Sequence, residues 1–174
     1  MAVGELVRAE LARHDWASLR CGCGDDAEHL PLMFETILEA GTPRDMIGYT
    51  LEDHVECNGS LFPCSPPAVA VILAALASGP SPLARGVLLQ TLWYMSGCDA
   101  PSGASGTIAE ECRAAADRGF WVLAHIGLAG DAEEAENVAE ICAGFGLGGE
   151  RYADYQRLFR ERAVARTKRR HRRF

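Results

Sequence analysis

The sequence lacks the features of a membrane or secreted protein. No window of about 18 residues is both apolar and uncharged, so no membrane-spanning helix is expected. A secretory signal has a basic segment followed by an apolar stretch, and the first residues do not show this pattern. We therefore expect a cytoplasmic protein with no membrane partner.

Strand patterns are missing as well. Apolar and polar residues never alternate over the four to eight residues that indicate a half-buried strand. Aromatic residues make up only 7% of the chain, whereas hydrophobic residues make up 48% and are rich in Ala and Leu. Both of these residue types lose little side-chain entropy in a helix, so the composition predicts an all-α fold.

Apolar residues recur at helical spacing in eight segments, with Gly, Pro, Ser or Asp in the short breaks between them. We expect helices over residues 4–19, 25–40, 43–57, 67–78, 82–97 and 107–128, a seventh capped by Asp131, and an eighth after residue 149. The segment 67–78 carries no charge, which predicts a central helix covered on several sides. Short connections favour antiparallel pairs of helices, packed as a short HEAT-like superhelix or as a bundle. The length suits one domain over residues 1–164, followed by a basic tail or helix extension over 165–174.

Residues 16–76 follow an order of short motifs that is similar to that of a known family. A helix containing Trp16 leads into a turn with Gly22 and Gly24. A helix start at His29-Leu30-Pro31, a charged turn at Arg44 and a helix start at Pro67-Ala68-Val69 follow. This order resembles that of small HEAT-like repeat proteins of actinobacterial type. The resemblance implies a helical-repeat fold whose surfaces bind partner proteins. A composition in which Lys168 is the only lysine among 17 basic residues is likewise typical of high-GC bacteria.

A histidine among carboxylates is the first candidate for chemistry. Three acidic residues lie within helical reach of His54, namely Glu52, Asp53 and Glu56. A carboxylate beside an imidazole raises the pKa of the ring and can orient it for general acid–base catalysis. The same pattern is typical of a solvated acidic helix face. If the protein is an enzyme, we expect His54 to act with Glu56 or Glu52 in a small bacterial hydrolase, lyase or cyclase.

The seven cysteines are an odd number, and several fall on apolar helix faces, so structural disulfides are not expected. Cys21 and Cys23 fall in a glycine-rich turn, and Cys57 and Cys64 flank a second loop. His29 and His54 are nearby in the sequence, so a zinc site or a redox-active pair is an alternative. The common structural-zinc signature has two cysteine pairs with two to four residues inside each pair. Neither Cys-Gly-Cys nor the six-residue gap between positions 57 and 64 matches that signature. We therefore predict reduced cysteines with no metal and no other cofactor.

Aromatic residues supply the candidate binding surface. Large aromatic side chains offer contact area together with a polar group, and the candidates are Trp16, Trp93, Tyr94, Trp121 and His125, with a role in the core as the alternative. A helical scaffold without a recognisable catalytic signature favours a binding or adaptor protein that engages a protein partner. An immunity-type inhibitor is one version of this function, and a small-molecule ligand is another possible occupant.

The C-terminal segment has a charge opposite to that of the remaining chain. Residues 151–174 hold ten of the 17 basic residues and two of the 24 acidic ones, a net charge of +8, whereas residues 1–150 carry −15. Dense arginine neutralises nucleic-acid phosphates, so nucleic acid is an alternative partner. An acidic body repels the same polymer, however. We expect this segment to continue the eighth helix and to act in intramolecular or protein–protein contacts.

Truncation after Val164 tests the role of the tail. We expect an unchanged midpoint of thermal unfolding, because the removed residues carry charge rather than core side chains. We also expect weak binding to duplex DNA and RNA by both chains across a salt series. Sub-micromolar, strongly salt-dependent binding that is lost on truncation would instead assign a nucleic-acid partner.

Overall fold

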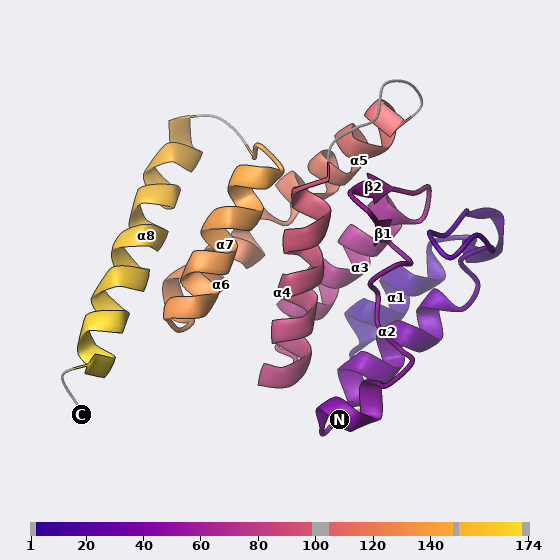
Figure 1. The fold of residues 1–174 in the computed structure, drawn as a ribbon, viewed down its shortest axis with the longest axis horizontal. Coiled ribbons are helices and arrows are strands. Elements are labelled where there is room, and N and C mark those ends of the chain that lie inside the picture. Colours follow the sequence, from indigo (N-terminus) through magenta and orange to yellow (C-terminus); the bar gives the residue numbers. More distant parts are fainter. Residues whose placement is uncertain (1–2, 99–104, 148–149, 172–174) are drawn as a thin grey trace.

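The structure, a computed structural model, describes residues 3–98, 105–147 and 150–171 (Figure 1). Within these ranges the fold is all-α, as the composition predicts, apart from one hairpin of two very short strands. The α-helices are α1 (Glu5–Ala12), α2 (Leu30–Glu39), α3 (Ser65–Ala77), α4 (Pro82–Ser96), α5 (Ser105–Arg118), α6 (Phe120–Ala129), α7 (Ala132–Gly144) and α8 (Glu150–His171). The 3₁₀ helices η1 (Trp16–Ser18) and η2 (Pro43–Met46) and the strands β1 (Glu56–Cys57) and β2 (Ser60–Leu61) lie in the N-terminal part. None of the helices in the described ranges has the length and apolarity needed to cross a membrane.

The helices form two layers. Figure 1 shows α2, α4, α7 and α8 side by side on the near face, and each of them contacts the next in that order. Behind them, α1 contacts α3, and α3 contacts α5 and α6. The stack therefore grows along the chain from α1 and α2 at one end to α8 at the other.

Helix α3 is the centre of the core. It carries no charged residue, and its buried side chains are Ser65, Ala68, Val69, Val71, Ile72, Leu73, Ala75 and Leu76. It contacts α1, α4, α5 and α6, so the prediction of a central, covered helix is confirmed. Each buried Val, Leu or Ile contributes about 1.5–3 kcal/mol relative to an exposed one, which makes this helix a major source of folding free energy.

The predicted helix over residues 107–128 is wrong, because it is two helices that meet at Gly119. A Cβ at Gly119 would lie 2.5 Å from Leu73 Cδ1 of α3. A larger residue here would require the Leu73 side chain to move, so glycine fits the place where the chain bends and passes the central helix. Apolar periodicity runs through the bend and gives no sign of it.

The first two predicted helices are too long. Helix α1 ends at Ala12, and Trp16 then turns into the core, where its indole N–H donates to Leu11 O at 2.8 Å. Helix α2 begins only at Leu30, because residues 20–26 form a turn closed by a bridge between Arg20 and Asp26. Helix α2 therefore starts five residues later than the start predicted at Asp25.

The predicted helix over residues 43–57 is wrong beyond its first turn. Gly48 and Asp53 both have positive φ angles, 82° and 64°, which an α-helix does not allow. The chain then forms the antiparallel hairpin β1–β2 around Asn58-Gly59, with φ angles of 50° and 75°. Asn-Gly with two positive φ angles is a strong hairpin signal, so the expectation of no strand at all is also wrong.

The remaining helices follow the sequence pattern closely. Helices α3 and α4 begin and end within two residues of the predicted bounds. Asp131 caps α7, accepting from the Glu134 amide at 3.0 Å while Glu134 accepts from the Asp131 amide at 2.8 Å. Helix α8 continues through His171, past residue 164, where the expected domain ends. The predicted loop over 98–106 falls mostly outside the described residues.

Helix α8 is held against α6 and α7 by an aromatic cluster. Phe159 is completely buried, and a Cβ added to Gly127 of α6 would lie 2.8 Å from its ring. Phe120 packs edge-to-face against Tyr155, with ring centroids 5.3 Å apart. The Tyr152 hydroxyl donates to Ala139 O of α7 at 3.2 Å. The last helix is thus part of the core through its first half.

Phe159→Ala tests this docking. Removal of a fully buried aromatic ring should lower the free energy of unfolding by about 3–5 kcal/mol, because it combines lost burial with a cavity. Leu158→Ala on the same helix is the control, since Leu158 is 37% exposed and should cost less than about 1.5 kcal/mol. Urea unfolding of both variants measures the difference. Equal losses would contradict the docked position of α8.

Candidate functional site

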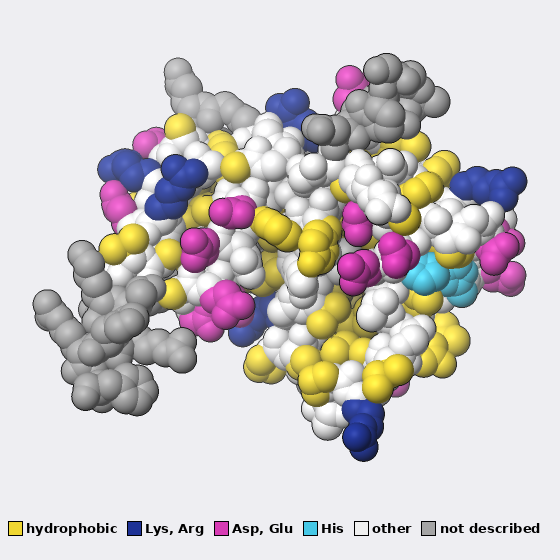
Figure 2. All heavy atoms as spheres, viewed as in Figure 1, with side chains coloured by type: hydrophobic (Ala, Val, Ile, Leu, Met, Phe, Trp, Pro, Cys, Tyr) yellow, Lys and Arg dark blue, Asp and Glu magenta, His cyan; other side chains and the backbone are white. Residues whose placement is uncertain are grey.

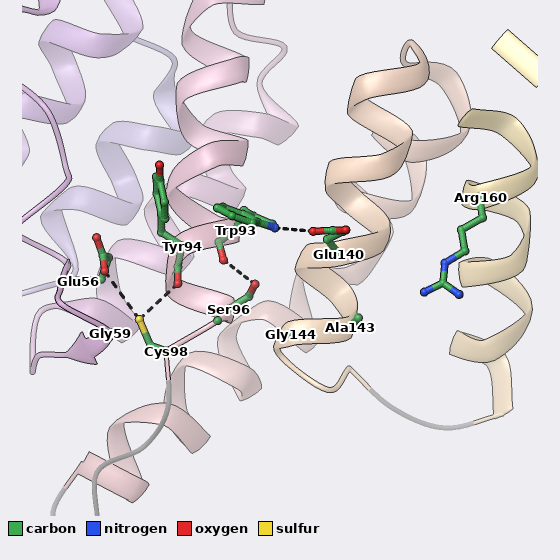
Figure 3. A pocket seen from close by; sticks show the side chains of 11 residues that line it. Glu56, Gly59, Trp93, Tyr94, Ser96, Cys98, Glu140, Ala143, Gly144 and Arg160 are labelled. Atoms are coloured by element: carbon green, nitrogen blue, oxygen red, sulfur yellow. Dashed lines mark hydrogen bonds between the residues drawn. The ribbon is translucent and has the colours of Figure 1, made fainter. Parts of the chain in front are cut away.

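A groove lies between α4 and α7, beside the β1–β2 hairpin (Figure 3). Its main cavity has a volume of about 500 Å³ and is lined by Glu56, Gly59, Trp93, Tyr94, Ser96, Gly97, Cys98, Glu140, Ala143, Gly144 and Arg160. A second cavity of about 460 Å³ shares Trp93 and Glu140 with it and is otherwise lined by Gly86, Gln90, Glu133, Glu136 and Asn137. The two cavities therefore adjoin each other at Trp93 and Glu140. We call the pair the α4–α7 groove.

The contact of α4 with α7 sets the geometry of the groove. Gly144 allows the close approach, because a Cβ there would lie 2.5 Å from Ser96 Oγ. Trp93 of α4 is 41% exposed, and its indole N–H donates to Glu140 Oε2 of α7 at 2.8 Å. The Tyr94 ring lies edge-to-face against Trp93, with ring centroids 5.1 Å apart. The Tyr94 hydroxyl also accepts from Gln90 Nε2 at 3.3 Å, so packing and two hydrogen bonds hold the neighbouring aromatic residues at the groove.

Carboxylates surround these aromatic rings. Figure 2 shows acidic side chains spread over the face of α4 and α7, around a hydrophobic patch. Burial raises the pKa of Glu56, and the nearby charges of Glu52 and Asp53 raise it further. Arg160 of α8 lies at the edge of the main cavity (Figure 3). Among the described residues, the lining of the second cavity has carboxylates and no basic side chain.

The aromatic candidates divide between the groove, the core and a separate surface. Trp93 and Tyr94 lie together in the groove, as the binding-surface hypothesis requires. Trp16 is only 6% exposed and packs against Phe34, so it belongs to the core rather than to a binding surface. Trp121 and His125 are exposed on α6, where Trp121 packs edge-to-face against Tyr155 of α8. These two residues are therefore not part of the groove lining.

The acid–base candidates face different neighbours. His54 Nδ1 lies 2.8 Å from His29 Nε2 and 3.3 Å from Cys21 Sγ. Glu56 instead accepts from Cys98 Sγ at 3.9 Å, at the edge of the groove. Burial lowers the pKa of His54 and the charge of His29 lowers it further, outweighing Asp53, so the expected upward shift is not found. Catalysis by His54 with Glu56 or Glu52 stays a prediction.

The fold gathers two cysteines and two histidines that are distant in the sequence. One ligand-type atom from each of Cys21, Cys23, His29 and His54 lies within 4.8 Å of the others, and we call these four residues the Cys/His cluster. Burial raises the pKa of Cys21 to about 11. None of the seven cysteines is in a disulfide, and Cys57 is not part of this group. Cysteine spacing alone missed the cluster, because half of it is supplied by histidines.

Comparison of the chain with protein-family models, with curated proteins and with solved structures finds no match. The resemblance of residues 16–76 to HEAT-like repeat proteins therefore stays a prediction.

Glu56→Gln tests the electrostatics of the groove edge. A carboxyl group whose pKa is raised by folding destabilises the folded state when it is ionised, so the variant should be more stable than the natural chain at pH 7. The difference should shrink as the pH falls toward 4.5, the ordinary pKa of glutamate, where the natural side chain becomes neutral. Urea unfolding between pH 4 and pH 8 measures it. Glu110→Gln, an exposed site on α5, controls for the change in net charge, and an equal gain there would contradict the account.

Proposed function

We propose that the protein is a helical binding protein that engages a positively charged segment of a protein partner in the α4–α7 groove. The observation that carries this proposal is the position of exposed Trp93 and Tyr94 among the carboxylates of Glu56 and Glu140. The two layers of successively packed helices support a HEAT-like repeat architecture as part of it. We also propose that the protein is bacterial and cytoplasmic, as expected from its sequence.

The chemistry of the groove fits an arginine or lysine side chain. A cation is attracted by the face of an indole ring, and a guanidinium also hydrogen-bonds to carboxylates. A carboxylate offers about four lone-pair positions, so Glu140 can accept from a partner while it keeps its bond to Trp93. The second cavity is the preferred place for the cation, because Glu133, Glu136 and Glu140 line it. Arg160 disfavours a cation at the far end of the main cavity.

The charge of the chain favours the same class of partner. Residues 1–150 carry a net charge of −15, which attracts a basic segment over a distance of about 8 Å at physiological ionic strength. Such attraction raises the association rate and selects against acidic partners and nucleic acids. Exposed Trp and Tyr at the centre of a groove are the residue types that most often dominate binding energy.

Selection of random peptides displayed on phage tests this proposal. We expect the peptides retained by the natural protein to be enriched in Arg and Lys. Trp93→Ala should weaken their binding by about 30-fold or more, because loss of a dominant interface residue costs at least about 2 kcal/mol. Fluorescence anisotropy with labelled synthetic peptides measures the dissociation constants.

Trp121→Ala is the matched control, since Trp121 is an exposed tryptophan, 58% accessible, outside the groove. Its peptide affinity should stay within about twofold of the natural protein, a change below about 0.5 kcal/mol. Unfolding curves establish that both variants are folded. Retained peptides without a basic bias, or equal binding by the natural protein and Trp93→Ala, would overturn the proposal.

A further inference from the structure

We propose that the Cys/His cluster is a binding site for one zinc ion, with Cys21 Sγ, Cys23 Sγ, His29 Nε2 and His54 Nδ1 as its four ligands. This inference is independent of the α4–α7 groove. It replaces the prediction of metal-free cysteines, which was based on the spacing of the cysteines along the chain.

Four of the six separations within the cluster lie within about 0.5 Å of the edges of a zinc tetrahedron, and the other two are no longer than 4.8 Å. Zinc–sulfur bonds of about 2.3 Å and zinc–nitrogen bonds of about 2.0–2.1 Å place sulfur and nitrogen about 3.6 Å apart and two nitrogens about 3.3 Å apart. Cys21 Sγ lies 3.3 Å from His54 Nδ1 and 3.6 Å from His29 Nε2. Cys23 Sγ lies 4.0 Å from His29 Nε2. The two nitrogens, now 2.8 Å apart, have to separate by about 0.5 Å to admit the ion.

The backbone is shaped to bring these side chains together. The Gly22 amide donates to His54 O at 2.8 Å, and a Cβ on Gly22 would lie 2.6 Å from Asp53 O. Any other residue would push the cysteine turn away from His54. The Cys23 amide also donates to the sulfur of Cys21, a bond that favours a thiolate. Gly24, with a φ of 95°, then turns the chain back, so the Cys-Gly-Cys-Gly sequence forms a tight loop around the sulfurs.

The donor set selects zinc over the other common cations. Magnesium and calcium prefer oxygen ligands, whereas two thiolates and two imidazoles are a standard tetrahedral set for zinc. Each thiol gives up its proton as its sulfur binds, so one Zn²⁺ enters and two protons leave, and the site becomes neutral. Four protein ligands complete the coordination shell, which is typical of a structural rather than a catalytic ion.

The ion would join three segments that have little other regular structure. Cys21 and Cys23 lie in the turn after η1, His29 precedes the first residue of α2, and His54 lies in the irregular segment before β1. Between α2 and α3 the chain contains only the short η2 helix and the β1–β2 hairpin. A metal crosslink here stabilises the folded state by its binding free energy, because the unfolded chain does not hold the four ligands together.

A hydrogen bond between the two imidazoles is the competing account of the cluster. It explains the distance of 2.8 Å between His29 and His54, with one ring donating to the other. It does not explain why two sulfur atoms converge on the same nitrogens. The two accounts differ in metal content, in the response to chelators and in the effect of removing a thiol.

The test uses the full chain without a histidine tag, purified under reducing conditions. Elemental analysis should find one zinc per chain. Cobalt added to the chelator-stripped protein should give the visible absorption of a tetrahedral ion together with sulfur-to-cobalt charge-transfer bands. Stripping should lower the midpoint of thermal unfolding, and zinc, but not magnesium, should restore it.

Cys23→Ser is the main variant, because Cys23 is exposed and its replacement should leave the fold least disturbed. It should bind zinc at least about tenfold more weakly in competition with a chromophoric chelator, since loss of a direct ligand should cost no less than loss of a supporting contact. Cys57→Ser, a nearby thiol outside the cluster, should still bind one zinc with unchanged affinity. Absence of zinc and of cobalt–sulfur bands in the natural protein would overturn the proposal. Equal zinc affinity in Cys23→Ser and the natural protein would also overturn it.

Discussion

The close approach of the cysteine turn to the backbone at His54 is the constraint on which the N-terminal half of the structure depends. Gly22 donates to His54 O, and the next contacts in the chain fix the start of the central helix. The Ser65 hydroxyl donates to Val55 O at 2.6 Å, and the Cys64 amide donates to Arg20 O at 3.3 Å. The position of α3, against which α1, α4, α5 and α6 pack, is therefore tied to the segment that holds the Cys/His cluster.

The two candidate sites differ in their geometry and in the kind of ligand that each can bind. The Cys/His cluster is small and partly buried, with Cys21 inside and Cys23 exposed, and its ligand atoms converge on one point, which is the geometry of an ion site. The α4–α7 groove is open, acidic and lined by aromatic side chains, which is the geometry of a surface that meets another molecule. The hairpin connects them, because His54 lies just before β1 while Glu56, in β1, lines the groove. A crosslink at the cluster would thus hold one edge of the groove in place.

The sequence predicts the helical body better than the irregular N-terminal region, for physical reasons. The α3, α4 and α7 segments carry their own signals in an uncharged run, in Pro82 and in the Asp131 cap. The break at Gly119 lies where the chain passes Leu73 of α3, and this contact is not visible in any local sequence pattern. The Cys/His cluster depends on a turn that brings position 54 against position 22. The sequence therefore shows the four residues as candidates but gives no sign that they lie together. Asn58-Gly59 was a readable hairpin signal that helical periodicity concealed.

X-ray absorption at the zinc edge, recorded on the untagged full chain, tests the central claim most directly, because it counts ligands by element and distance. The account predicts two sulfur neighbours at about 2.3 Å and two nitrogen neighbours at about 2.0–2.1 Å, with the scattering pattern of imidazole rings beyond them. A shell made only of nitrogen and oxygen, or a sulfur count other than two, would contradict it.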